Sequence, residues 1–290
     1  MGAADIVPGV SGGTLAFILG IYERFLRALT SFGREAFHLL RRGRIKTFWQ
    51  HIDGAFLCCL FGGILLSIGA LASVVTHFLE HRPVPLWALF NGLILAALPW
   101  LLKPIQFNLK RYLLLVLGAL LALSISFLTP VHTDPLPWMF FVAGFIAICA
   151  MILPGISGSF LLLLMGMYAP IVAAVSDARI SMLALFATGC VLGLLVFSRV
   201  LTSLLKRFHD SMLALLCGIV IGALYRIWPW QIEGSPISPG LYAETFGRTD
   251  ILLAAVFFII GALLIQGLMK LEKLLGGSPQ KEIETAERLD

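Results

Sequence analysis

Charged residues are scarce in this chain of 290 residues, because Asp, Glu, Lys and Arg together make up only 13% of it. A soluble protein of this length carries roughly a quarter charged residues. The mean hydropathy is +0.95, and 59% of the residues are hydrophobic. This composition excludes an ordinary soluble domain. It also excludes nucleic acid as the main partner, since a net charge of +5 has no extended solvated face to occupy here.

The five cysteines have neither a pairing pattern nor the spacing of metal ligands. They all lie inside apolar runs, at Cys58, Cys59, Cys149, Cys190 and Cys217. We therefore expect no disulfide framework, no metal site and no cofactor. A cleavable signal peptide is not expected either, because Met1–Ala4 has no basic residue and leads directly to Asp5.

Long apolar runs are what the sequence has in abundance. A helix needs about 20 apolar residues to cross the hydrocarbon core of a bilayer. Six runs meet this requirement: Gly54–Leu79, Pro85–Leu102, Tyr112–Leu128, Ile180–Leu205, Met212–Trp228 and Ile251–Met269. The sequence therefore predicts a multi-pass, all-α integral membrane protein.

Two further apolar stretches contain the element Pro-Gly-x-Ser-Gly, at Pro8–Gly12 and Pro154–Gly158. Because proline and glycine stop helices, each element predicts the broken tip of a re-entrant hairpin, either buried in protein or lining a cavity. In the second hairpin, the half-helices are expected at Trp138–Leu153 and Ser157–Pro170. Two ordinary kinked spans are the alternative.

Lys and Arg are concentrated in alternate connections between the runs, which predicts the topology. Seven basic residues precede Gly54: Arg24, Arg27, Arg34, Arg41, Arg42, Arg44 and Lys46. The connections with Lys103, Lys110 and Arg111 and with Lys206 and Arg207 are also basic. We expect these connections and the C-terminus to lie in the cytoplasm. The two hairpins then enter the membrane from opposite sides.

The chain repeats itself at an offset of 146 residues and, further on, at 126 and 143. The paired residues are Pro8 with Pro154, Ser11 with Ser157, Gly20 with Gly166, Tyr22 with Tyr168, Gly63 with Gly189, Gly92 with Gly218, and Gly118 with Gly261. The predicted fold is two inverted-topology repeats, 1–129 and 137–272, each a re-entrant helical hairpin plus three transmembrane helices, with a polar cytoplasmic tail at 273–290. The first hairpin has a short lead, so we expect its N-terminal half-helix to be missing. Such repeats are typical of alternating-access transporters.

Hydroxyl groups and glycines stand at the start of the helix that follows each tip. Free N–H groups and a partial positive charge at a helix N-terminus favour anions such as phosphate. The candidate phosphate-binding residues are Ser11, Gly12, Gly13, Thr14, Ser157, Gly158 and Ser159. The alternative is that the small residues let the tips pack closely and that the serines are N-caps.

Two arginines within the spans, Arg199 and Arg226, are further candidates, because ionisable groups in a membrane are costly and a guanidinium binds phosphate through two hydrogen bonds. The alternative is that both side chains reach the headgroups. The candidates for coupling or gating are Asp5, Tyr22, Glu23, Arg24 and Tyr168. The basic connection Ser31–Ile52, interleaved with aromatic residues, predicts either an amphipathic segment on anionic lipid or a plain topology-setting loop.

Four stretches resemble the PopT family of bacterial undecaprenyl-phosphate translocases: Gly2–Thr14, Gly20–Arg24, Leu153–Ser159 and Gly222–Trp230. The resemblance extends over nearly the whole chain. It implies a carrier in the bacterial plasma membrane that returns undecaprenyl phosphate from the outer to the cytoplasmic leaflet, for reuse in building peptidoglycan and other envelope polymers. Its partners are that lipid and the membrane lipids, with proton or sodium coupling left open.

Two other functions are alternatives to the lipid carrier. The tips are also similar to those of undecaprenyl-pyrophosphate phosphatases, in which an arginine is expected directly after the serine together with a glutamate pair. Gly12 and Gly158 occupy that position here, and no span contains such a pair, so the chain is not expected to be an enzyme. An ion-coupled carrier of a small soluble anion is the second alternative.

Overall fold

The computed structural model describes residues 1–7, 10–128, 135–232 and 235–274 of the chain, with side chains as far as residue 271. Three segments for which the sequence makes predictions lie wholly or mostly outside these residues. They are Pro8 and Gly9 of the first tip, the connection Thr129–Pro137 and the polar tail.

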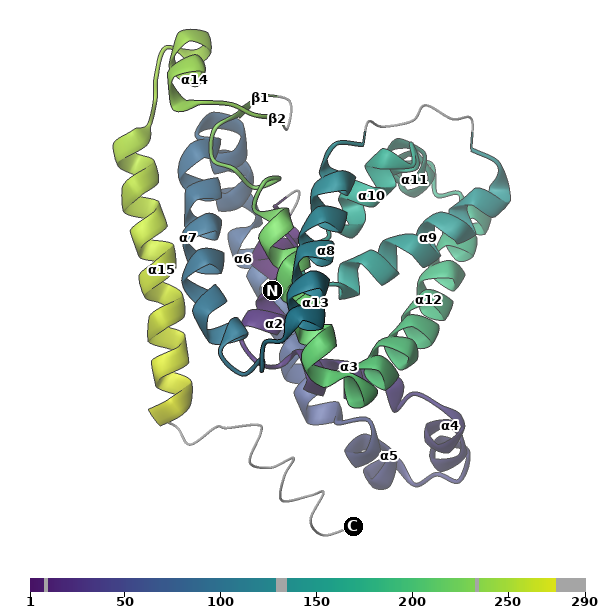
Figure 1. Ribbon diagram of the computed structural model, residues 1–290. Helices are drawn as coiled ribbons and strands as arrows, with labels where there is room; N and C mark the ends of the chain where they lie inside the picture. Colours follow the sequence, from purple (N-terminus) through teal and green to yellow (C-terminus); the bar gives the residue numbers. More distant parts are fainter. Residues whose placement is uncertain (8–9, 129–134, 233–234, 275–290) are drawn as a thin grey trace.

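The described residues are almost entirely helical (Figure 1). The helices are α1 (Gly2–Asp5), α2 (Gly12–Ile18), α3 (Tyr22–Thr30), α4 (Arg34–Arg41), α5 (Ile45–His51), α6 (Gly54–His81), α7 (Pro83–Leu102), α8 (Leu109–Ser126), α9 (Pro137–Ile152), α10 (Gly158–Leu164), α11 (Tyr168–Ser176), α12 (Ile180–Arg207), α13 (His209–Ala223), α14 (Pro239–Phe246) and α15 (Ile251–Leu274). Two short antiparallel strands, β1 (Gln231–Ile232) and β2 (Ser235–Pro236), lie between α13 and α14.

Five helices among the described residues are long and apolar enough to cross a membrane: α6, α7, α8, α12 and α15. They confirm five of the six predicted runs. The sixth run, Met212–Trp228, is a shorter helix than expected, because α13 has 15 residues and ends at Ala223. The half-helix predicted at Ser157–Pro170 is instead two helices, α10 and α11, which meet at 104°.

The sequence repeat is also a repeat of local structure. α2 and α10 have seven residues each, and α3 and α11 have nine each, at the same offset of 146. Gly20 and Gly166 lie between them with φ of 69° and 67°, a left-handed conformation that ends the preceding helix. α6 and α12 have 28 residues each at the offset of 126. The two halves therefore share the order and the lengths of these helices.

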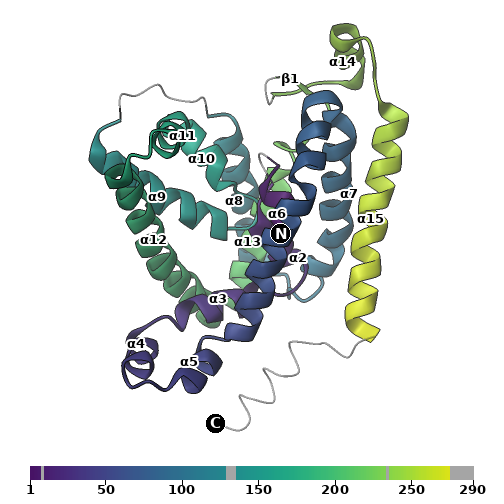
Figure 2. The same cartoon turned by 180° about the vertical axis from the view of Figure 1, so that it is seen from behind.

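Three pairs of helices pack closely: α7 with α15, α8 with α13, and α9 with α12 (Figures 1 and 2). A glycine from each helix lies at the contact. The pairs are Gly92 and Gly261, Gly118 and Gly218, and Gly144 and Gly189. A Cβ atom at any of them would overlap a carbonyl oxygen of the partner helix. Small residues thus let the backbones approach, as is usual between membrane helices.

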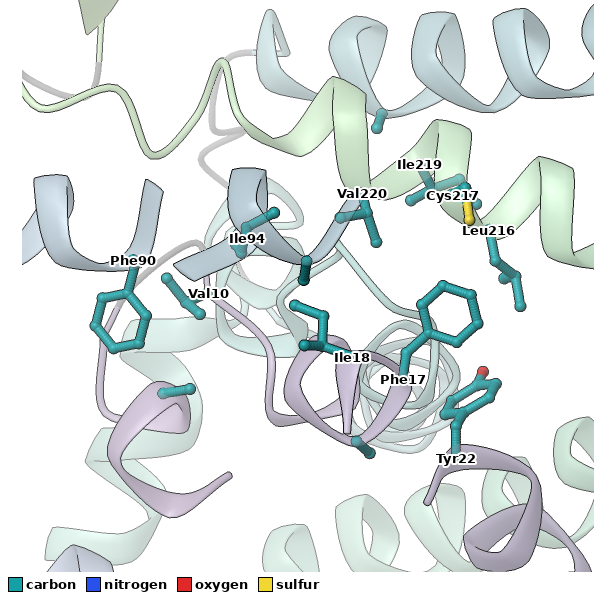
Figure 3. Close-up of a cluster of buried hydrophobic side chains, with 14 of the residues drawn as sticks. Val10, Phe17, Ile18, Tyr22, Phe90, Ile94, Leu216, Cys217, Ile219 and Val220 are labelled. Carbon is teal, nitrogen blue, oxygen red and sulfur yellow. The ribbon is translucent and has the colours of Figure 1, made fainter. Parts of the chain in front are cut away.

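The short helix α2 lies at the centre of the core, and six of its seven residues are buried. Figure 3 shows Phe17 and Ile18 of α2 among side chains of α7 and α13, including Ile94 and Val220. The rings of Phe17 and Tyr22 meet edge to face with their centroids 5.5 Å apart. The counterpart of α2 in the second half, α10, is less buried, with three of its seven residues buried. The repeated hairpins therefore have different environments.

The first prediction compares the matched glycines Gly63 and Gly189. Gly189→Ala would bring a Cβ onto the Phe141 carbonyl oxygen, whereas a Cβ at Gly63 meets no atom within 4 Å. We expect Gly189→Ala to destabilise the protein by about 1–3 kcal/mol. Gly63→Ala should stabilise it by about 0.5–1 kcal/mol, because alanine favours the helix. Thermal unfolding in one detergent measures both, and equal shifts of the midpoint would contradict this packing.

Candidate functional site

The second tip is a tight turn between α9 and α10. Gly155 has φ of 86°, and a Cβ there would lie 2.9 Å from the Ile219 carbonyl oxygen of α13, so only glycine fits. Ser157 is the N-cap of α10, and its Oγ accepts a long hydrogen bond of 3.5 Å from Phe160 N. The hydroxyls of Ser157 and Ser159 are 2.9 Å apart. The turn therefore presents two neighbouring hydroxyl groups.

Arg226 lies beside this tip. Its guanidinium is over the ring of Phe160, 4.2 Å from the centroid. Arg226, Gly155, Ser157 and Phe160 line one cavity, which is completed by Ala122, Ile125, Ser126, Ile156 and Ala223. The cavity has a volume of about 20 Å³, which is room for about one water molecule. The structure thus brings Ser157 and Arg226, two predicted site residues that are 69 positions apart in the chain, to one small cavity.

The position of Arg226 depends on the early end of α13. After Ala223 the chain makes turns, and side chains bind the carbonyl groups that a longer helix would have used. Gln231 Nε2 donates to the Arg226 oxygen at 3.2 Å and to the Trp228 oxygen at 2.6 Å. Asn91 Nδ2 donates to the Ile227 oxygen. The matching helix of the first repeat, α7, continues through the equivalent positions to Leu102.

Asn91 and Gln231 are functional candidates that the sequence analysis missed. Asn91 is 5% exposed on α7 and also donates to the Trp87 oxygen at 3.2 Å. A lone amide in an apolar run is the signal that would have found it, because a buried polar side chain needs a partner. Gln231 carries no such signal in the sequence.

At the first tip, the N–H groups are already bonded within the chain. Gly12 N donates to Asp5 Oδ1 at 2.7 Å, and Gly13 N donates to Ser11 Oγ at 3.1 Å. Ser11 is thus the N-cap of α2, and the Asp5 carboxylate lies where an anion would approach. The Asp5 carboxylate therefore accepts a hydrogen bond from an N–H group that was expected to bind phosphate at this tip.

Polar side chains of the first tip and of the helices α2 and α3 that follow it bind the end of α9 and the second tip. Ser11 Oγ donates to the Met151 oxygen at 3.2 Å, and Tyr22 Oη donates to the Ile152 oxygen at 3.1 Å. Thr14 Oγ1 accepts from Gly155 N at 2.8 Å. The first tip therefore caps the last carbonyl groups of α9 and joins the two halves.

Arg199 lies away from the cavity. Its Nη2 donates to the Phe32 oxygen at 2.9 Å, between α3 and α4. Arg199 is on α12 two turns before the link to α13, whereas Arg226 follows the far end of α13. The structure does not bring the two arginines together.

The remaining candidates are distributed over the helix ends. Arg24 forms an ion pair of 2.7 Å with Asp53, which lowers the pKa of that carboxyl group from its usual value of 3.8. Glu23 lies 3.6 Å from His209 Nδ1. Tyr22 is 2% exposed, whereas Tyr168 is 47% exposed, so the repeated tyrosines have different surroundings.

A larger and shallower hollow lies on the outer face of α15. Its volume is about 420 Å³, and the described residues that line it are all apolar or glycine: Ile260, Leu263, Leu264, Gly267, Leu268 and Leu271. Among the described residues, no group of three or more His, Cys, Asp or Glu is arranged to hold a metal ion.

Comparison with known proteins identifies the family of the chain. The model of the undecaprenyl phosphate translocase-like family matches residues 1–237. A protein of Vibrio cholerae serotype O1 named polyprenyl-phosphate transporter is 47% identical over 232 residues, which cover 80% of this chain and 75% of the relative. A Staphylococcus aureus protein of the same name is 31% identical over 249 residues, covering 79% and 83%. No solved structure matches significantly. The chain is therefore a multi-pass membrane protein that belongs to the undecaprenyl phosphate translocase-like family.

Proposed function

We propose that this protein transports polyprenyl phosphate across the bacterial plasma membrane and binds its phosphate at the second tip. The observation that carries the proposal is the cavity shared by Arg226 and Ser157, next to Ser159. A phosphate group does not cross hydrocarbon unaided, because its charge loses hydration. A guanidinium with two hydroxyl groups supplies charge-assisted hydrogen bonds in place of that water. The two relatives named polyprenyl-phosphate transporter support this substrate.

The isoprenoid tail has a route that stays in lipid. One wall of the cavity is α8, through Ala122, Ile125 and Ser126. The other side of α8 exposes large apolar residues to the surroundings: Leu113, Leu117, Leu120 and Leu121. A phosphate in the cavity is thus one helix away from hydrocarbon, which suits a lipid substrate better than a small soluble anion.

Transport requires the site to open, because a volume of about 20 Å³ does not admit a phosphate. We propose that the repeats 1–129 and 137–272 have inverted topologies and rock against each other, exposing the site first to the outer and then to the cytoplasmic leaflet. In this scheme the C-terminus is cytoplasmic and the lipid is recycled inward. Asp5, which holds the first tip at Gly12 N, is the candidate for coupling to a proton or sodium ion.

A phosphatase is the rival function, and the lining of the cavity argues against it. Hydrolysis of a pyrophosphate needs a group that activates water or protonates the leaving oxygen. Among the described residues, the cavity lining contains no Asp, Glu or His. Release of inorganic phosphate from undecaprenyl pyrophosphate by the purified protein would overturn the transporter assignment.

The test of the proposed site is Arg226→Gln in vesicles that exchange polyprenyl phosphate between leaflets. We expect exchange to slow by at least about tenfold, because a charged hydrogen-bond donor is lost from the site. Arg226→Lys should retain part of the rate. Arg199→Gln is the matched comparison and should change it less than about twofold. An unchanged rate in Arg226→Gln would refute the site.

The tip serines should separate into two classes. Ser11→Ala leaves the Met151 carbonyl and Gly13 N without their side-chain partner, so we expect a loss of stability of about 1–2 kcal/mol. Ser157→Ala and Ser159→Ala should instead raise the KM for the lipid with a smaller loss of stability, because the N-cap hydrogen bond that Ser157 accepts is long, at 3.5 Å. Thermal unfolding and concentration-dependent exchange distinguish the classes. A KM effect confined to Ser11→Ala would reverse the assignment.

Asn91 should act through Arg226, because it fixes the neighbouring carbonyl of Ile227. Asn91→Leu keeps the branched shape and the number of heavy atoms and removes that hydrogen bond, so we expect slower exchange. In the Arg226→Gln background the same substitution should slow exchange no further, since residues in one network are not additive. If Asn91→Leu slowed exchange as much in the Arg226→Gln background as in the wild type, Asn91 would act on the stability of the fold and not through Arg226.

A further inference from the structure

We propose that the α4–α5 hairpin is a docking surface for anionic phospholipid headgroups. The residues from Arg34 to His51 carry five Lys or Arg and one acidic residue, Glu35. The basic side chains are all exposed: Arg34, Arg41, Arg42, Arg44 and Lys46. This inference is independent of the proposed phosphate site at Arg226.

Large apolar side chains accompany these charges on the exposed surface of the hairpin. Phe37 is 67% exposed and Leu40 is 52% exposed on α4, while Ile45 and Trp49 are 68% and 44% exposed on α5. Within each helix the two residues are three or four positions apart, so they share a face. Ala36 is the one fully buried residue of α4, and α5 has none. The hairpin is therefore amphipathic, and Phe37, Leu40 and Ile45 remain outside the packed bundle.

The hairpin is held at both ends by membrane-spanning helices. Arg199 of α12 donates to the Phe32 oxygen, just before α4. After α5, a Cβ at Gly54 would come within 2.5 Å of Trp49 Cδ2, so the indole lies against the start of α6. Figures 1 and 2 show α4 and α5 beyond the ends of α6 and α12. Because both spans end there, the hairpin lies at the depth of the headgroups.

The chemistry of the surface selects an anionic membrane over other occupants. A basic helix pair with exposed aromatic and aliphatic side chains inserts its apolar groups among the acyl chains and pairs its charges with anionic headgroups. A second copy of this chain would instead bring like charges together. The position of the hairpin at the headgroups supplies the membrane as the nearest partner.

Hydrogen–deuterium exchange of the full chain in nanodiscs tests this assignment. One bilayer contains phosphatidylglycerol and the other only phosphatidylcholine. We expect backbone amides of residues 34–51 to exchange at least about fivefold more slowly in the anionic bilayer, since docking suppresses local opening. The difference should shrink at about 0.5 M salt, which screens exposed charges.

Two charge variants and one apolar variant sharpen the test. Arg42→Gln/Arg44→Gln should lose most of the protection, whereas Lys103→Gln/Lys110→Gln, which removes two charges elsewhere, should retain it. Phe37→Ser/Ile45→Ser should lose it as well. Equal exchange in the two bilayers would overturn the proposal. Protection that appears only with two copies per nanodisc would also overturn it and assign the surface to self-association.

Discussion

A helix that ends inside a membrane protein must find partners for its last carbonyl groups, because hydrocarbon offers none. α9 ends in this way at Ile152, and its partners come from the other repeat, through Ser11 and Tyr22. Thr14 adds a third bond, to Gly155 of the second tip. These contacts join α2 and α3 of the first repeat to α9 and the second tip.

The two halves have helices of matching length and order, but their tips lie in different surroundings. The first tip is closed by Asp5 and sits in the core, where it holds α9 and the second tip. The second tip faces a cavity and carries a second hydroxyl, Ser159, where the first has Gly13. α13 also stops five residues before the position that matches the end of α7, which sets Arg226 beside that tip. The features that the halves share form the scaffold, and the differences between them bring Ser157 and Arg226 to the candidate site.

Much of the fold follows from the sequence, because long apolar runs and Pro-Gly breaks act locally. The length of α13 does not, since the turns that follow it are held by Gln231 at the Arg226 carbonyl and by Asn91 at the Ile227 carbonyl, which no local pattern links to Arg226. The surroundings of Arg199 escape prediction for the same reason: its partner is the backbone of Phe32, 167 positions away. The sequence shows which polar residues lie in apolar runs. Long-range contacts, which the sequence does not show, determine which of these residues lie at the cavity.

The small volume beside Arg226 also bears on the energy supply of the cell. Space for about one water molecule cannot hold a file of waters along which protons hop from one side to the other. In the proposed transport cycle, the packing of the second tip against Arg226 must yield to a bulky headgroup. Between such events the same packing would limit proton leakage at this tip.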